Sequence, residues 1–166
     1  ATWNALFWII MLFAAVNAVS KSFVQESAGR QLYYFNLAAP LSIIISKTIY
    51  NVMLMVMLSL LNLLIFSLLM DQFIQNWAVF TLTLVLGGVG LASLLTMIAA
   101  IASRTNNNFS LMAVLSFPIV LPLLLTLMKA SKQALGVTTL AESGGLLAVI
   151  FLLSILPAIL SVLLFP

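Results

Sequence analysis

Five long apolar runs dominate this sequence of 166 residues, and short polar segments separate them. Most of the runs reach or exceed the roughly 20 residues that a helix needs to cross the hydrocarbon core of a bilayer. The runs are Trp3–Val19, Leu41–Met70, Trp77–Ala102, Phe109–Met128 and Gly145–Phe165. None of them shows the ten-residue alternation that is typical of outer-membrane barrel strands. The sequence therefore predicts an all-α membrane protein, a bundle of five transmembrane helices.

The scarcity of charge supports this prediction and excludes several functions. Charged residues make up 5% of the chain, whereas soluble domains carry roughly 25%. The six basic residues form no run that could follow a nucleic-acid backbone. The chain contains no Cys and no His, so we expect no disulfide, no metal site and no axial haem ligand of these types within it. An intramembrane enzyme is a weak alternative, because the sequence offers neither a Ser–His dyad nor a pair of Asp residues within a span.

The basic residues also predict the orientation, because Lys and Arg are enriched in cytoplasmic loops. Four of them lie in or beside the first and third connections, and two lie in the fourth. The four are Lys21, Arg30, Lys47 and Arg104, and the two are Lys129 and Lys132. We therefore expect the first connection to be cytoplasmic. The chain begins in an apolar run without Met or a basic flank, so we also expect it to be a piece of a longer protein.

The first connection, Ser20–Pro40, is the only one long and polar enough to hold structure of its own. Glu26 and Arg30 are four residues apart with the acid first, which is the favourable order on a helix. Pro40 suits the first turn of the next helix. One interpretation is a solvated loop. The other is a short helix in the membrane interface that docks a cytoplasmic partner and transmits a push to the two adjoining spans.

Several motifs together resemble one family of transport proteins. They are Phe23-x-x-Glu26-x-x-Gly29, then Leu37–Ser42 around Pro40, then Lys47, the paired prolines in Ser116–Leu125 and the small residues in Leu86–Ala100. This combination resembles the permeases of ABC exporters, and among them the haem exporter permeases (B subunits) of the cytochrome c maturation system. The resemblance runs over most of the chain, to about Lys132.

The resemblance implies a single permease domain over residues 1–166. Members of the family have six spans, so we expect this piece to lack its N-terminal interfacial segment and first span. By the resemblance, Phe23, Glu26, Gly29, Arg30 and Pro40 would couple the permease to a cytoplasmic ATPase subunit. The chain has no G-x-x-x-x-G-K-[ST] loop, so ATP would bind to that partner and this subunit would not be an enzyme.

The function that the resemblance implies is to couple ATP hydrolysis to haem export, or to release of a haem-loaded chaperone, in the inner (plasma) membrane of a bacterium. Haem would be handled or transported, and no cofactor would be bound by this chain alone. The implied partners are other membrane subunits of cytochrome c maturation and a second permease copy or a related subunit, besides the ATPase and the lipid bilayer. The alternatives are an exporter of a lipid, drug or polysaccharide, and a purely structural assembly subunit.

Two further pairs of residues have a functional and a structural interpretation. Pro118 and Pro122 would bend the fourth span, either as a hinge or wall of a substrate path, or as a static kink. Lys129 and Lys132 would attract an anionic group at the outer face, or would simply anchor the span at the interface.

Small and polar residues inside the spans predict helix packing. The third span contains a patch of small residues, namely Gly87, Gly88, Gly90, Ala92 and Ser93. Within it, Gly88 and Ala92 are four residues apart, a spacing that favours close helix–helix contact. For Asn17, Asn51 and Asn62, which are costly in a bilayer when unpaired, we expect hydrogen bonds between helices.

Overall fold

The computed structural model of this chain describes residues 2–24, 33, 36–37, 39–70, 74–102, 108–136 and 140–164. Its long helices are α1 (Thr2–Val24), α3 (Pro40–Met70), α4 (Trp77–Ala102), α5 (Asn108–Ala134) and α6 (Leu140–Leu164). All five are long and apolar enough to cross a membrane. The described residues contain no β-strand. The predicted all-α membrane bundle of five helices is therefore confirmed.

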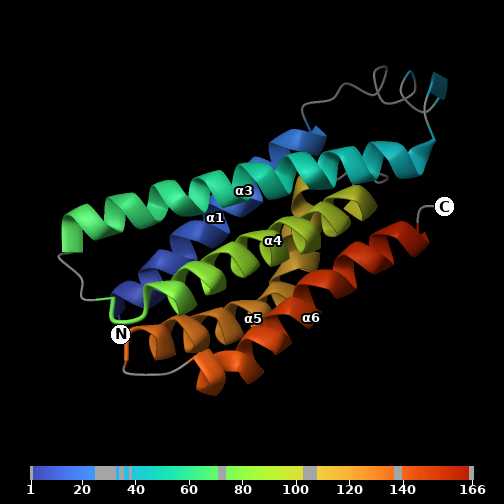
Figure 1. Cartoon of the computed structure of the whole chain (residues 1–166). Helices are drawn as coiled ribbons and strands as arrows, with labels where there is room; N and C mark the ends of the chain where they lie inside the picture. The colour runs from blue at the N-terminus through green and yellow to red at the C-terminus, as the bar shows by residue number, and fades with distance from the viewer. Residues whose placement is uncertain are drawn as a thin grey trace.

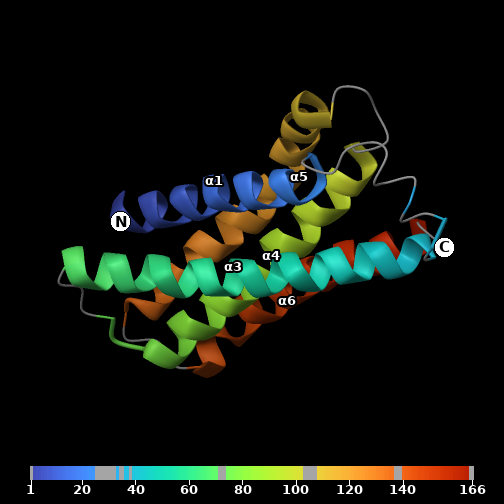
Figure 2. The same ribbon diagram turned by 90° about the horizontal axis from the view of Figure 1, so that it is seen from above.

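The helices run back and forth between two ends of the bundle (Figure 1). The first end is here called the Pro40 end. Helices α1, α4 and α6 end there, and helices α3 and α5 begin there. The opposite end, here called the Trp77 end, holds the start of α1, the connection from α3 to α4, and the connection from α5 to α6. Seen from above, α1 and α3 lie side by side along much of their length (Figure 2).

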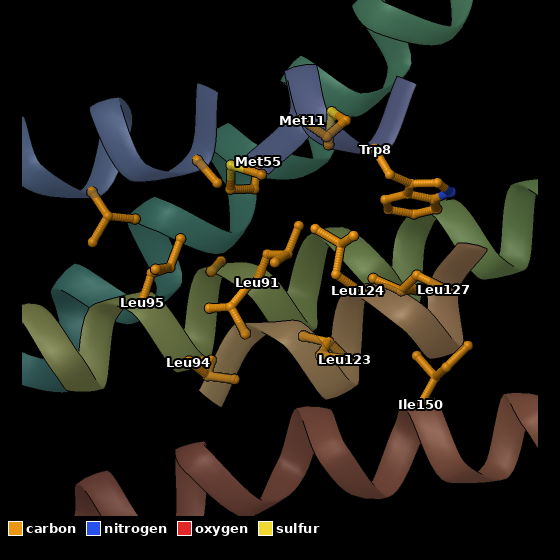
Figure 3. Packing of buried hydrophobic residues seen from close by; sticks show 14 of the residues in the cluster. Trp8, Met11, Met55, Leu91, Leu94, Leu95, Leu123, Leu124, Leu127 and Ile150 are labelled. Carbon is orange, nitrogen blue, oxygen red and sulfur yellow. The ribbon is translucent and has the colours of Figure 1, made fainter. Parts of the chain in front are cut away.

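Helix α4 is the centre of the bundle. It contacts each of the other four helices, and 72% of its most apolar stretch is buried, compared with 11% for α3. The core that surrounds it takes Trp8 and Met11 from α1, Met55 from α3, Leu123 and Leu127 from α5 and Ile150 from α6 (Figure 3). Since little of α3 is buried, most of its apolar surface is available to lipid or to other proteins.

Glycines make the central position of α4 possible, as the small-residue patch predicted, but the closest approaches are at Gly87 and Gly90 and not at Gly88, where an added Cβ atom would meet nothing nearer than 3.7 Å. A Cβ atom added to Gly87 would lie 2.7 Å from Cη2 of Trp8 and 2.8 Å from Cδ2 of Leu127. A Cβ atom at Gly90 would lie 2.7 Å from Oγ of Ser154. Neighbouring helices therefore approach the backbone of α4 more closely than any larger residue would allow.

Three helix boundaries differ from the predicted ones. Helix α1 continues to Val24, α5 continues to Ala134, and α6 already begins at Leu140. The predicted limits followed the apolar residues alone, but a helix can continue beyond the hydrocarbon into the interface. Lys21 and Lys132 lie in the last turns of α1 and α5, where a cation interacts favourably with the negative end of the helix dipole.

Two of the three in-span asparagines bond between helices as expected. Nδ2 of Asn51 donates to Oγ1 of Thr96 over 3.0 Å, and Nδ2 of Asn62 donates to the carbonyl oxygen of Phe7 over 3.5 Å. The prediction for Asn17 is wrong, because this residue is exposed and donates to the carbonyl of Phe13 in its own helix, at 3.0 Å. A bond to its own helix satisfies the amide without a neighbouring helix.

Candidate functional site

The candidate coupling site lies at the Pro40 end, where residues 25–39 connect α1 to α3. Three of its predicted residues, Glu26, Gly29 and Arg30, lie outside the described residues, as does most of the predicted interfacial helix. The described part of the site consists of the last turn of α1 and the first turns of α3. These turns hold the two ends of the connection.

A lysine joins the two helices at the base of this connection. Nζ of Lys47 lies 4.2 Å from the centroid of the Phe23 ring and donates a hydrogen bond of 3.1 Å to the carbonyl oxygen of Ser22. The carbonyl groups in the last turn of a helix lack partners within the helix and carry its partial negative charge. One ammonium group thus binds both an aromatic face and a helix C-terminus. We call this contact of Lys47 with Phe23 and Ser22 the Lys47 clamp.

Proline sets the start of α3, as predicted. Pro40 is the first residue of the helix, where its missing N–H group costs nothing because no acceptor precedes it. The amide of Ser42 donates to the carbonyl of Ala39 over 3.0 Å, which closes the first turn. The ring fixes the backbone φ angle at this point. The direction in which the chain enters α3 is therefore restricted.

The clamp is connected to the central helix through the next turn of α3. Asn51, four residues after Lys47, is buried and bonds to Thr96 on α4. Phe23 is itself 7% exposed and belongs to the apolar core around α4. The Lys47 clamp and the bond from Asn51 to Thr96 therefore link α1 to α3 and α3 to α4 at the Pro40 end.

Two prolines interrupt the backbone hydrogen bonds of α5. Pro118 and Pro122 both lie inside the helix, and Figure 1 shows α5 changing direction along its course. The bend follows from the loss of two amide donors and from the clash of each ring with the preceding turn. Both prolines are exposed, so their rings lie on the outer surface of this chain. Their action as a hinge, or beside a substrate path, stays a prediction.

A buried polar network ties α1 to α5 at the Trp77 end. Nε1 of Trp8 donates to Oγ of Ser131 over 2.9 Å, and that hydroxyl lies 2.9 Å from Oδ1 of Asn4. Nδ2 of Asn4 donates to the carbonyl of Met128 over 3.0 Å. All three side chains are buried. The network fixes the position of the Trp8 ring against Gly87 of α4.

The two lysines predicted to contact an anion lie beside this network. Lys129 and Lys132 are exposed and three residues apart on the last turns of α5, so they share one side of the helix. The structure places them at the opposite end of the bundle from the Lys47 clamp. Their position suits either interfacial anchoring or contact with an anionic group, so the anion contact stays a prediction.

Sequence reasoning missed the roles of Ser131 and Lys47. Ser131 was placed in a connection because the fourth span was expected to end at Met128. The spacing of Asn4 and Trp8, four residues apart, was the available signal for a polar stripe on the first span. In the sequence, Lys47 indicated the orientation and contributed to the family resemblance, but it was assigned no partner. A cation seven residues inside an apolar helix requires a partner, and this requirement is the signal that could have predicted a contact for Lys47.

The described residues contain no group of three or more potential metal ligands of the His, Cys, Asp or Glu type. A comparison with family models gives a match to the family described as CcmB protein, over residues 2–166. Searches of curated proteins and of solved structures give no match.

Proposed function

Since the chain belongs to the CcmB family, the haem exporter permeases of cytochrome c maturation, we propose that it is the membrane subunit on which a partner ATPase acts. The connection of residues 25–39 docks on the ATPase, with Glu26, Gly29 and Arg30 at the contact. Nucleotide-driven movement of the ATPase then displaces the ends of α1 and α3. The result is export of haem, or release of a haem-loaded chaperone, at the opposite face of the bacterial inner membrane.

The Lys47 clamp is the observation that carries this proposal. A connection between two helices transmits force to both only if the helix ends are held together. Otherwise each helix end moves independently, and a force on the connection does not move the two helices together. The ammonium of Lys47 provides that link between α1 and α3. From there, Asn51 bonds to Thr96 of α4, and Phe23 belongs to the core cluster that includes the buried residues of α4.

The chemistry of the chain supports a mechanical role. The sequence has no phosphate-binding loop, so ATP hydrolysis belongs to the partner. Without His or Cys, this subunit offers haem iron neither of these axial ligands, and such a ligand would come from a neighbouring subunit. Lys129 and Lys132 are exposed at the Trp77 end, and in this proposal they attract an anionic group such as a carboxylate.

The test is to co-purify the full-length permease with its ATPase and membrane partners in mild detergent. Glu26→Lys reverses a charge at the proposed contact, and Glu142→Lys makes the same change on an exposed residue at the Trp77 end. We expect the first variant to lose the ATPase while retaining the other membrane subunits. The second should retain all of them. Equal ATPase retention in both variants would refute docking through the connection.

A second variant separates docking from transmission. Lys47→Met removes the clamp but leaves residues 25–39 unchanged. We expect it to retain the ATPase and to lower delivery of haem to cytochrome c per ATP hydrolysed. Normal delivery at a normal rate of hydrolysis would contradict the role assigned to the clamp.

A further inference from the structure

Helix α4 is packed less tightly against α3 than against α5 and α6. An added Cβ atom at Gly90 would lie 2.7 Å from Oγ of Ser154 on α6, and one at Gly87 would lie 2.8 Å from Cδ2 of Leu127 on α5. Both distances are too short for a real Cβ contact, so these helices interlock with α4 at its glycines. An added Cβ atom at Gly88 would instead meet the backbone of α3 at 3.7 Å, an ordinary van der Waals distance. Helix α3 therefore does not interlock with α4 at this glycine.

The buried side of α3 that faces α4 repeats every four residues. Its members are Asn51, Met55 and Ser59. The facing row of α4 has the same spacing and no side chain larger than that of threonine, and its members are Thr96, Ala92 and Gly88. Two contacts fix the register: Nδ2 of Asn51 donates to Oγ1 of Thr96 over 3.0 Å, and the Cβ position of Gly88 lies 3.8 Å from Oγ of Ser59. We call this contact between the two rows the α3–α4 seam.

The small residues of the α4 row make the seam smooth. Packed helices usually resist sliding, because ridges of side chains on one helix lie in grooves of the other. Here the α4 row offers no ridge, and Met55 of the α3 row has an unbranched side chain that adapts to irregular surfaces. Helix α3 lies along one side of the bundle, and 11% of its most apolar stretch is buried (Figure 1). Sliding of α3 along α4 therefore meets little steric resistance.

Hydrogen bonds to the backbone tie α5 and α6 to α4. Oγ of Ser93 on α4 donates to the carbonyl oxygen of Ser154 on α6 over 3.0 Å. The amide of Asn76, directly before α4, donates to the carbonyl oxygen of Ala134 at the end of α5 over 3.2 Å. Together with the close contacts at the two glycines, these bonds hold α4, α5 and α6 as one unit.

The hydrogen bonding of the seam, in contrast, is incomplete. Asn51 is 1% exposed, and its Nδ2 bonds to Thr96, but among the described residues its Oδ1 has no hydrogen-bond partner. A buried acceptor without a partner costs free energy. The amide therefore stabilises the observed position of α3 less than it would with both polar atoms bonded, and α3 leaves this position more easily.

We propose that α3 is the helix that moves when residues 25–39 are displaced. It slides along the α3–α4 seam, and the Lys47 clamp takes the last turns of α1 with it. Helices α4, α5 and α6 stay together, and the buried network of Trp8 and Ser131 holds the start of α1 in place. Such sliding of packed helices is a shear motion. This motion rests on the proposed function, in which the ATPase supplies the displacement.

The test uses disulfide locks in the full-length permease, purified with its ATPase and membrane partners. The sequence contains no cysteine, so each introduced pair is the only one within it. Ser59→Cys with Gly88→Cys crosses the seam, where Oγ of Ser59 lies 3.8 Å from the Cβ position of Gly88. Gly90→Cys with Ser154→Cys is the matched control between α4 and α6, where the corresponding distance is 2.7 Å. Each variant with its disulfide reduced is its own reference.

The readout is the rate of ATP hydrolysis by the purified complex. We expect the rate to fall about fivefold or more when the seam is locked, because a motion of the cycle can no longer be completed. Reduction should restore it, and the lock between α4 and α6 should leave it unchanged. Equal rates with the seam locked and reduced, or an equal loss from both locks, would overturn the proposal. An unmodified complex that does not retain the ATPase would instead refute the proposed function, so the two failures are distinguishable.

A second measurement leaves the seam itself unaltered. Spin labels at Met53→Cys of α3 and Ile101→Cys of α4, which are both exposed, report the position of α3 along α4. Ile101→Cys with Leu152→Cys of α6, also exposed, is the control pair. We expect the first distance to change by about 2 Å or more when ATP binds to the complex, and the second to stay constant. Two constant distances, or two distances that change equally, would overturn the proposal.

Discussion

The contact between Lys47 and Phe23 allows a quantitative test of the clamp. Lys47→Met retains an unbranched side chain and removes the ammonium group. The lost interactions include a cation–π contact at 4.2 Å and a hydrogen bond of 3.1 Å from a charged donor. These are worth about 1 kcal/mol and about 1.5–3 kcal/mol. Part of this lost stabilisation is offset, because the native ammonium group no longer has to be desolvated and the lysine side chain no longer has to be ordered. We therefore expect the free energy of unfolding to fall by about 1–2 kcal/mol.

The assay is reversible unfolding by SDS in mixed micelles, followed by far-UV circular dichroism. A double-mutant cycle with Phe23→Leu isolates the pair from other contacts of Lys47. We expect a coupling energy of about 0.5–2 kcal/mol between the two positions. If the two single effects add to within about 0.3 kcal/mol, the two side chains do not interact and the Phe23 contact of the clamp is refuted.

Three further predictions concern packing, the polar network and orientation. Gly87→Ala should lower the free energy of unfolding by about 1–3 kcal/mol, because the hydrogen bond that holds Trp8 prevents its ring from making room. Ser131→Ala should lower the free energy of unfolding by about 1–3 kcal/mol and change the Trp8 fluorescence, since the buried indole N–H loses its acceptor. In a chain without native cysteine, an impermeant maleimide should label Lys132→Cys from the outside of the cell and Lys21→Cys only after lysis.

Each of these predictions has a control or a contradicting result. Gly144→Ala meets nothing within 4 Å and should be neutral or stabilising. A comparable loss in both glycine variants would reject the packing argument. Unchanged stability in Ser131→Ala would show that the polar network does not stabilise the fold. Labelling of Lys21→Cys in intact cells would contradict the predicted orientation.

The sequence was sufficient for the number and type of helices, because the long apolar runs leave no alternative in a chain with nine charges. It also indicated that the small-residue patch of α4 makes close contact, but the spacing argument pointed to Gly88 and Ala92, whereas the closest approaches are at Gly87 and Gly90. It did not reveal that α4 is central. Trp77–Ala102 and Leu41–Met70 are similarly apolar, and only the positions of the neighbouring helices make one buried and the other exposed.

The candidate site was predicted only in part, for a physical reason. Pro40 was recognisable, because the restricted φ angle of proline is a local property that suits a helix start. The pairing of Lys47 with the end of α1 was not, because it depends on the rotation of two helices about their axes. The same applies to Ser131 and Trp8, which are 123 residues apart in the chain. Contacts of this kind follow from the packing of the bundle and have no sequence motif.

The most direct measurement is a cross-link from the connection to the ATPase. A single cysteine is introduced as Arg30→Cys in the full-length permease, which is then purified with its partners and treated with a short bifunctional maleimide. Lys132→Cys, at the opposite end of the bundle, serves as the control. We expect an adduct of permease and ATPase from Arg30→Cys alone, with a yield that changes when ATP is added. An absent adduct, or equal yields from the two positions, would contradict the claim that this connection is where the ATPase acts.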